Sequence, residues 1–110
     1  MVRTFVEKLA TARRNKKCGN HNVVWVGKKY WDMYSEEVPS CETMKITRLF
    51  QYHGHTIVAV NDETEEFWMS HCGWYTVSTK NALAGYRDWF KAMGYTWVNP
   101  FSIYKYEDKA

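Results

Sequence analysis

The chain has few of the features that mark exported, membrane-spanning or disulfide-stabilised proteins. It contains no apolar run long enough to cross a bilayer and no basic leader followed by a small-residue cleavage site. Its three cysteines, Cys18, Cys41 and Cys72, leave at least one thiol unpaired. We therefore expect a protein of the reducing cytoplasm that has no membrane partner.

Signatures of catalysis are also missing. The sequence has no glycine-rich phosphate loop, no strand-serine-helix elbow and no dinucleotide fingerprint. The adjacent acids Glu65 and Glu66 would point to opposite faces of a strand, so they do not form a carboxylate pair. These absences predict a protein that is not an enzyme and that carries no cofactor.

Without repeats, low-complexity tracts or an interdomain linker, residues 1–110 are expected to form one domain with its own core. What the chain does have is aromatic side chains, 17% of the total, and an uneven distribution of charge. Residues 1–29 carry eight Lys or Arg and one acid, whereas residues 30–110 carry seven and eleven. A basic end followed by an acidic body favours a polyanion or an acidic protein surface as the partner.

Apolar spacing predicts a helix over residues 2–15, and a β-prone segment from Asn22 to Val26 predicts a strand. The helix would place five apolar side chains on one face: Val2, Phe5, Val6, Leu9 and Ala12. Residues 1–20 are therefore interpreted as a basic helix and turn. The mixed composition of residues 28–42 predicts an irregular connection.

Residues 43–106 are expected to contain the core, beginning with a meander of three strands. The first strand would place Met44, Ile46, Phe50 and Tyr52 on one face, although Arg48 interrupts that apolar pattern. A turn at Gly54 precedes the second strand, residues 55–60, and the polar turn 61–64 precedes the third, residues 65–72.

A helix over residues 79–93 follows, with Ser78 or Thr79 as its N-cap and Gly94 just after its end. Residues 95–106 are expected to form a last strand with a break at Pro100. The predicted fold class is α+β: an antiparallel β-meander of three to four strands packed against the C-terminal-half helix, with an additional N-terminal helix.

One part of the chain resembles a known group of proteins. The segment Gly73-Trp74-Tyr75-Thr76-Val77-Ser78-Thr79-Lys80, which precedes a helix and follows Tyr52-His53-Gly54-His55, resembles small bacteriophage-encoded proteins of unknown function that carry Gly-Trp-x-Thr-x-(Ser/Thr)-Thr-Lys. The resemblance covers about two-fifths of the chain. It implies an accessory protein that binds a host or phage macromolecule in the cytoplasm of an infected bacterium. It supplies no catalytic residues.

Zinc binding is one hypothesis for the Cys and His residues. Cys18 and His21 have ligand spacing, and a tetrahedral set would need partners from among His53, His55, His71 and Cys72. Structural zinc sites normally show two such paired motifs, and only one is present. Isolated thiols and ordinary hydrogen-bonded histidines are the favoured interpretation, so we predict no metal site.

Two surfaces are candidates for binding. The first is a basic group suited to nucleic acid or an acidic partner: Arg13, Arg14, Lys16, Lys17, Lys28 and Lys29. The alternative is a solvated helix end that complements the helix dipole. The second surface, suited to a partner or an anion, consists of Trp74, Thr76, Thr79 and Lys80. For Trp74 itself the favoured interpretation is a core anchor that closes the sheet against the helix, and binding is the interpretation for the helix end.

The leading hypothesis is a non-enzymatic phage accessory protein that binds and modulates a host or defence macromolecule, with a protein as the favoured partner. The alternative is a nucleic-acid-binding module that uses the basic segment 13–29. Exposed aromatic side chains would also permit a homodimer.

Overall fold

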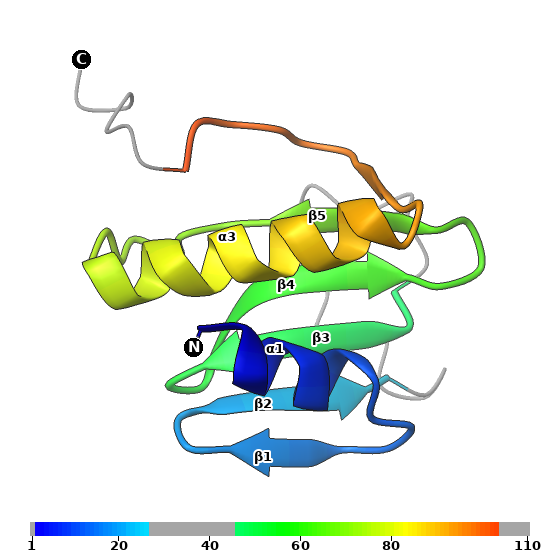
Figure 1. Ribbon diagram of the computed structural model, residues 1–110, viewed down its shortest axis with the longest axis horizontal. Coiled ribbons are helices and arrows are strands. Elements are labelled where there is room, and N and C mark those ends of the chain that lie inside the picture. The colour runs from blue at the N-terminus through cyan, green and yellow to red at the C-terminus, as the bar shows by residue number, and fades with distance from the viewer. Residues whose placement is uncertain (1, 27–45, 104–110) are drawn as a thin grey trace.

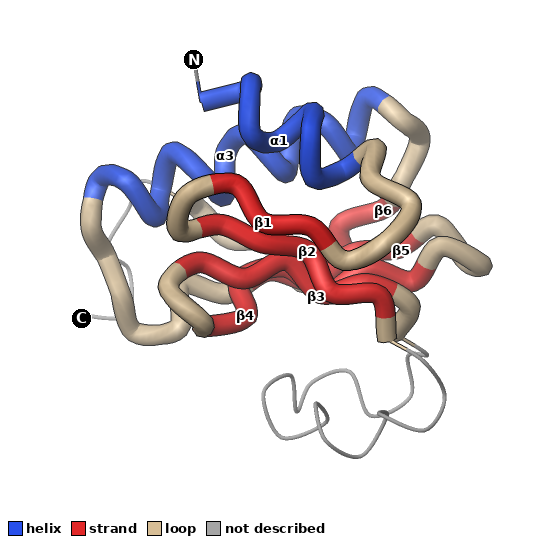
Figure 2. The backbone as a smooth tube through the Cα atoms, turned by 90° about the horizontal axis from the view of Figure 1, so that it is seen from below, coloured by secondary structure: helices blue, strands red, loops and turns tan. Residues whose placement is uncertain are grey.

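The structure, a computed structural model, describes residues 2–26 and 46–103. Within these ranges it has two layers, a six-stranded mixed sheet with two helices side by side on one face (Figures 1 and 2). The elements are α1 (Val2–Ala10), β1 (Lys16–Cys18), β2 (His21–Trp25), β3 (Arg48–Tyr52), β4 (His55–Asn61), β5 (Glu66–Met69), α3 (Val77–Ala92) and β6 (Thr96–Trp97). The α+β class is confirmed, whereas three to four strands was too few.

The strands lie in the sheet in chain order, from β1 at one edge to β6 at the other. All neighbouring pairs from β1 to β5 are antiparallel, so the predicted meander of β3, β4 and β5 is confirmed. The β6 strand pairs parallel to β5, because α3 carries the chain back across the sheet between them. Of the last strand predicted over 95–106, only Thr96–Trp97 is a strand within the described residues.

The N-terminal helix is shorter than the predicted 2–15. It ends at Ala10, and the basic residues that follow belong to a turn and to β1 instead. The side chain of Asn15 accepts a hydrogen bond of 2.7 Å from the backbone N–H of Trp25, which holds this turn against β2. A two-residue connection with Gly19 at φ 64° then joins β1 to β2. Hairpin pairing therefore overrides the helical pattern after Ala10.

Two further tight turns depend on left-handed backbone conformations. His53 (φ 52°) and Gly54 (φ 82°) form the two-residue connection between β3 and β4. Cys72 (φ 55°) and Gly73 (φ 80°) form a second turn, closed by a 2.9 Å bond from the N–H of Trp74 to the carbonyl of His71. Both pairs have the signs that a type I′ turn requires, with glycine at the second position.

The helix α3 begins earlier than predicted. Its N-cap is Thr76, whose hydroxyl accepts the N–H of Thr79, so the predicted caps Ser78 and Thr79 are wrong. The C-terminal end agrees with the prediction at Gly94. The backbone N–H of Gly94 donates to the carbonyl of Lys91, and the backbone N–H of Tyr95 donates to the carbonyl of Phe90. These two hydrogen bonds form a Schellman motif.

The main core lies between the helices and the sheet. Its fully buried members include Val6, Leu9, Phe50, Phe67, Leu83, Tyr86 and Phe90. A smaller buried cluster consists of Ile46, Leu49, Ala59 and Trp68. Its members on β3, β4 and β5 alternate along each strand with side chains of the main core. Ile46 was predicted to share the face of Phe50, but it packs with Leu49 instead.

Arg48, which interrupted the predicted apolar face, is buried in the main core, with only 5% of its surface exposed. Its guanidinium lies 5.1 Å from the ring centre of Trp25 and 5.4 Å from that of Phe90. It donates to the carbonyl of Ala10 at 2.7 Å and makes two bonds to Asp62, at 2.9 and 2.7 Å. One charged side chain thus joins α1, the β4–β5 turn and α3.

The carboxylate of Asp62 accepts hydrogen bonds from three side chains. Besides Arg48, it accepts hydrogen bonds from the hydroxyls of Thr47 (2.5 Å) and Tyr95 (2.7 Å). Burial alone would raise the pKa of the Asp62 carboxyl, but these bonds and the guanidinium outweigh it, so the pKa lies below its ordinary value. Burial and the bond to Asp62 raise the pKa of Tyr95 to about 12. Both charges of the pair are therefore stabilised inside the fold.

Replacing Arg48 by Met should lower the free energy of unfolding by about 3 kcal/mol, because it leaves the Asp62 carboxylate without its cation. Urea unfolding at pH 7 measures the effect. The matched control is Arg87→Met, which removes the more exposed pair between Arg87 and Asp88 and should cost less than about 1 kcal/mol. Equal losses in the two variants would contradict the structural role given to Arg48.

Candidate binding surfaces

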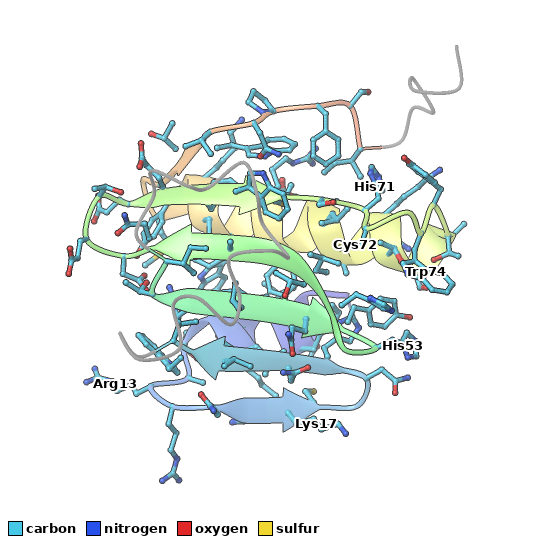
Figure 3. The ribbon with its side chains drawn as sticks, turned by 180° about the vertical axis from the view of Figure 1, so that it is seen from behind. Arg13, Lys17, His53, His71, Cys72 and Trp74 are labelled. Carbon is cyan, nitrogen blue, oxygen red and sulfur yellow. The ribbon has the colours of Figure 1, made fainter. Side chains whose placement is uncertain are left out.

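The basic residues predicted to bind a partner gather along the outer strand β1 and the turn before it. Arg13, Arg14, Lys16 and Lys17 are all exposed, and we call these four residues the basic edge. Figure 3 labels Arg13 and Lys17. Among the described residues, none of the four forms an ion pair. Lys28 and Lys29, which were predicted to extend this surface, lie outside the described residues.

A shallow hollow of about 570 Å³ lies beside the basic edge. Its lining includes Asn15, Lys16, Lys17, Asn20, Asn22 and His53. The amides offer hydrogen bonds and the two lysines offer positive charge, which is the chemistry that a polyanionic partner requires. We call this the edge hollow.

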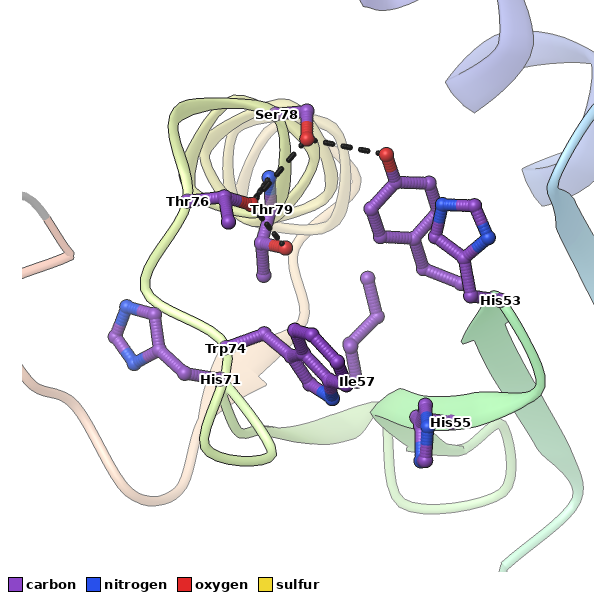
Figure 4. Close-up of a pocket in the computed structure, with 9 residues that line it drawn as sticks. His53, His55, Ile57, His71, Trp74, Thr76, Ser78 and Thr79 are labelled. Carbon is purple, nitrogen blue, oxygen red and sulfur yellow. Dashed lines mark hydrogen bonds between the residues drawn. The ribbon is translucent and has the colours of Figure 1, made fainter.

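A second hollow, of about 200 Å³, lies where β4 meets the start of α3 (Figure 4). Its lining includes Tyr52, His53, His55, Ile57, Trp74 and Ser78. Ring faces and the side chain of Ile57 make most of its wall apolar, and hydroxyls lie on the side of α3. We call this the Trp74 pocket.

Trp74 is 53% exposed and does not anchor the core, so the interpretation favoured from the sequence is wrong. The turn at Cys72 and Gly73 holds the residue at the rim of the pocket, where its ring centre lies 5.8 Å from that of His55. An exposed indole beside a hollow leaves apolar surface in water that a ligand can cover. The sequence named Trp74 as a possible contact only because it precedes the start of the helix, and that contact stays a prediction.

The hydroxyls of the pocket are linked to one another. Thr76 bonds to Thr79 at 3.0 Å, and Tyr52 donates to Ser78 at 3.1 Å. Thr79 is 2% exposed, so it supports the turn more than it offers a contact. Lys80 is half-buried and does not line the pocket. Of the four residues predicted here, Trp74 and Thr76 remain available at the surface.

The histidines do not converge on a single point. His53 and His71 lie on different sides of the Trp74 pocket in Figure 4, and the ring of His71 is within 3.2 Å of the carbonyl of Ile103. The thiol of Cys72 contacts the carbonyl of Thr56. Across residues 2–26 and 46–103, no group of three or more His, Cys, Asp or Glu side chains is placed to hold a metal ion.

His21 and Cys18, the pair with zinc-ligand spacing, have structural surroundings. The imidazole of His21 is stacked between Phe5 (3.8 Å between ring centres) and Tyr52 (4.3 Å). Cys18 packs against the main core. Burial, with a smaller contribution from the charge of His53, lowers the pKa of His21 to about 4. His21 therefore acts as a neutral ring within a stack, and its Nδ1 has no hydrogen-bond partner.

His53 is the residue that sequence reasoning underestimated. It lines both the edge hollow and the Trp74 pocket, so the two hollows meet at the tip of the β3–β4 hairpin. The signal was present as the dipeptide His53-Gly54 between two β-prone runs. Only the sheet order reveals that this tip lies beside the β1–β2 hairpin, where the N–H of His53 bonds to the carbonyl of Asn20 at 2.8 Å.

The chain matches no protein-family model, no curated protein sequence and no solved structure. Neither helix in the described ranges has the combination of length and hydrophobicity that crossing a bilayer requires.

Acid should destabilise the protein through His21. Because the folded pKa of about 4 lies below the ordinary 6.5, the neutral ring contributes full stability above pH 6.5 and loses it as the pH falls toward 4. His21→Phe keeps an aromatic ring in the stack but cannot be protonated. The drop in the free energy of unfolding between pH 7 and pH 4.5 should therefore be smaller in this variant by on the order of 2 kcal/mol, a value that allows for partial screening of the ring by solvent. Urea unfolding at pH 7 and pH 4.5 measures it.

The control for this test is His55→Gln, because His55 is exposed. It should show the same loss of stability between the two pH values as the unsubstituted protein. An acid loss in His21→Phe that equals that of the unsubstituted protein would show that His21 is not the responsible group.

Proposed function

We propose that this protein is a non-enzymatic binding protein that engages an acidic macromolecule through its basic edge. The observation that carries the proposal is the exposure of Arg13, Arg14, Lys16 and Lys17 along one edge of the sheet, without ion-pair partners in the described part of the chain. Four exposed cations on one strand and its turn form a local positive field that attracts and orients a polyanion.

The position of these cations at a sheet edge supports an acidic segment of another protein as the partner. An edge strand presents backbone N–H and C=O groups that an incoming strand can use. Lysines on such an edge repel a second copy of the same strand, but they attract a strand that carries Asp or Glu. In the context implied by the phage resemblance, the partner would be a host or defence protein whose activity is changed by this contact.

Nucleic acid is the second candidate, and one observation favours it. The basic edge continues, through His53, into the pocket where Trp74 is exposed, and aromatic side chains beside positive charge are typical of surfaces that bind single strands. The two candidates can therefore be distinguished by comparing the affinities of the protein for an acidic polypeptide and for a nucleic acid of equal charge.

The test compares poly-L-glutamate with a single-stranded oligonucleotide of equal charge, titrated at several salt concentrations. If all four cations of the basic edge take part, the logarithm of affinity for the oligonucleotide should fall with the logarithm of salt with a slope of about −3. The variant Lys16→Gln/Lys17→Gln should halve that slope and weaken binding about tenfold at low salt.

The matched control is Lys8→Gln/Lys91→Gln, which changes the net charge equally at two exposed positions outside the basic edge. Its affinity should stay within about twofold of the unsubstituted protein, because neither residue belongs to the strand and turn that the partner is proposed to follow. Failure of the unsubstituted protein to bind either polyanion at 50 mM salt would refute the proposed function. Equal weakening by both variants would show that net charge, not the basic edge, drives association.

A further inference from the structure

We propose that the acidic partner is single-stranded nucleic acid, whose backbone follows the basic edge while one unpaired base enters the Trp74 pocket. This inference rests on the proposed function and selects the second of its two candidate partners. It starts from an arrangement of residues that the sequence order hides. Lys17, His53 and Trp74 come from three different turns or strands, yet all three lie along the same side of the molecule (Figure 3).

The first step is continuity between the two hollows. His53 lines both of them, and the hydrogen bond from its N–H to Asn20 ties the two hairpins together at this point. A chain lying beside Lys16 and Lys17 would therefore reach the Trp74 pocket by passing over His53. A partner that combines regularly spaced negative charge with side groups fits this path.

The second step is the shape and chemistry of the pocket. At about 200 Å³ it is smaller than the roughly 300–1,000 Å³ typical of sites for drug-sized ligands, so it suits a single flat ring system. The indole of Trp74 and the ring of His55 lie at its rim, and Ile57 lies at its floor (Figure 4). Planar aromatic faces beside apolar side chains are what a nucleobase stacks on.

The third step is the choice of partner. In a duplex the base faces are covered by their neighbours, so a pocket that accepts a ring requires an unpaired base. Poly-acidic peptides satisfy the basic edge but bring carboxylates to the Trp74 pocket, where much of the wall is apolar. The hydroxyls of Thr76 and Ser78, both exposed at one side of the pocket, provide polar groups near the edge of an inserted ring. Single-stranded nucleic acid therefore satisfies both hollows together.

The experiment uses two probes with the same number of phosphates: a ten-residue oligothymidylate and an abasic oligomer of equal length. The full-length protein is titrated with each at 50 mM salt, and binding is followed by fluorescence anisotropy of an end label. The unsubstituted protein should bind oligothymidylate about tenfold more tightly than the abasic oligomer, because one stacked base distinguishes the probes at this site.

Three variants separate the two parts of the inference. Trp74→Ala should bind both probes with the affinity that the unsubstituted protein has for the abasic oligomer, whereas Trp74→Phe should retain part of the preference. Lys16→Gln/Lys17→Gln should weaken both probes by a similar factor and keep their ratio. Met93→Ala, which truncates another exposed apolar side chain, is the matched control and should change nothing. Thermal unfolding of each variant verifies that it is folded.

Each remaining outcome contradicts a defined part of the account. Equal affinity of the unsubstituted protein for both probes would overturn base insertion and leave the proposed function standing. Tighter binding to poly-L-glutamate than to oligothymidylate, or to a duplex of the same length than to the single strand, would overturn the single-stranded partner. Absence of binding to every polyanion would refute the proposed function itself.

Discussion

The ion pair between the buried Arg48 and the partly buried Asp62 is the interaction on which the arrangement of this protein depends. Its guanidinium bonds to the C-terminal carbonyl of α1, lies beside the rings of Trp25 and Phe90, and meets a carboxylate that also accepts bonds from Thr47 and Tyr95. A charge in an apolar core costs several kcal/mol unless its partners are complete, and here they come from both helical and sheet layers. The pair therefore selects one packing of α1 against the sheet.

That packing determines where the binding surfaces lie. With α1 ending at Ala10, the basic residues that follow are free to form a turn and an edge strand instead of another helical turn. The stack of Phe5, His21 and Tyr52 then joins α1 to the ends of β2 and β3, next to the hairpin tip that carries His53. This stack and the adjacent hairpin tip bring the basic edge next to the Trp74 pocket, although Lys17 and Trp74 are far apart in the sequence.

Much of the fold could be predicted from local pattern, because its periodic segments are long and its turns contain glycine. The meander of β3 to β5, the apolar stripe of α3 and the stop at Gly94 all follow from such signals. The strand β1 could not be predicted, since Lys16–Cys18 is three residues long and mostly polar, and its strand conformation depends on pairing with β2. The pairing of Arg48 with Asp62 could not be predicted either. Arg48 interrupts the apolar pattern of a strand and Asp62 lies in a polar turn, and neither position indicates its partner in the sequence.

The candidate site divides in the same way. Composition indicated the basic segment, but the exposure of Trp74 was not predicted, because aromatic residues are more often core residues. The connection between the two surfaces through His53 depends on sheet order, which single-sequence patterns do not contain. The account is tested most directly by mapping amide chemical shifts of the ¹⁵N-labelled protein during titration with a single-stranded oligonucleotide. It predicts that the largest shifts cluster at Lys16, Lys17, His53 and Trp74. Shifts centred instead on β6, at the opposite edge of the sheet, would contradict it.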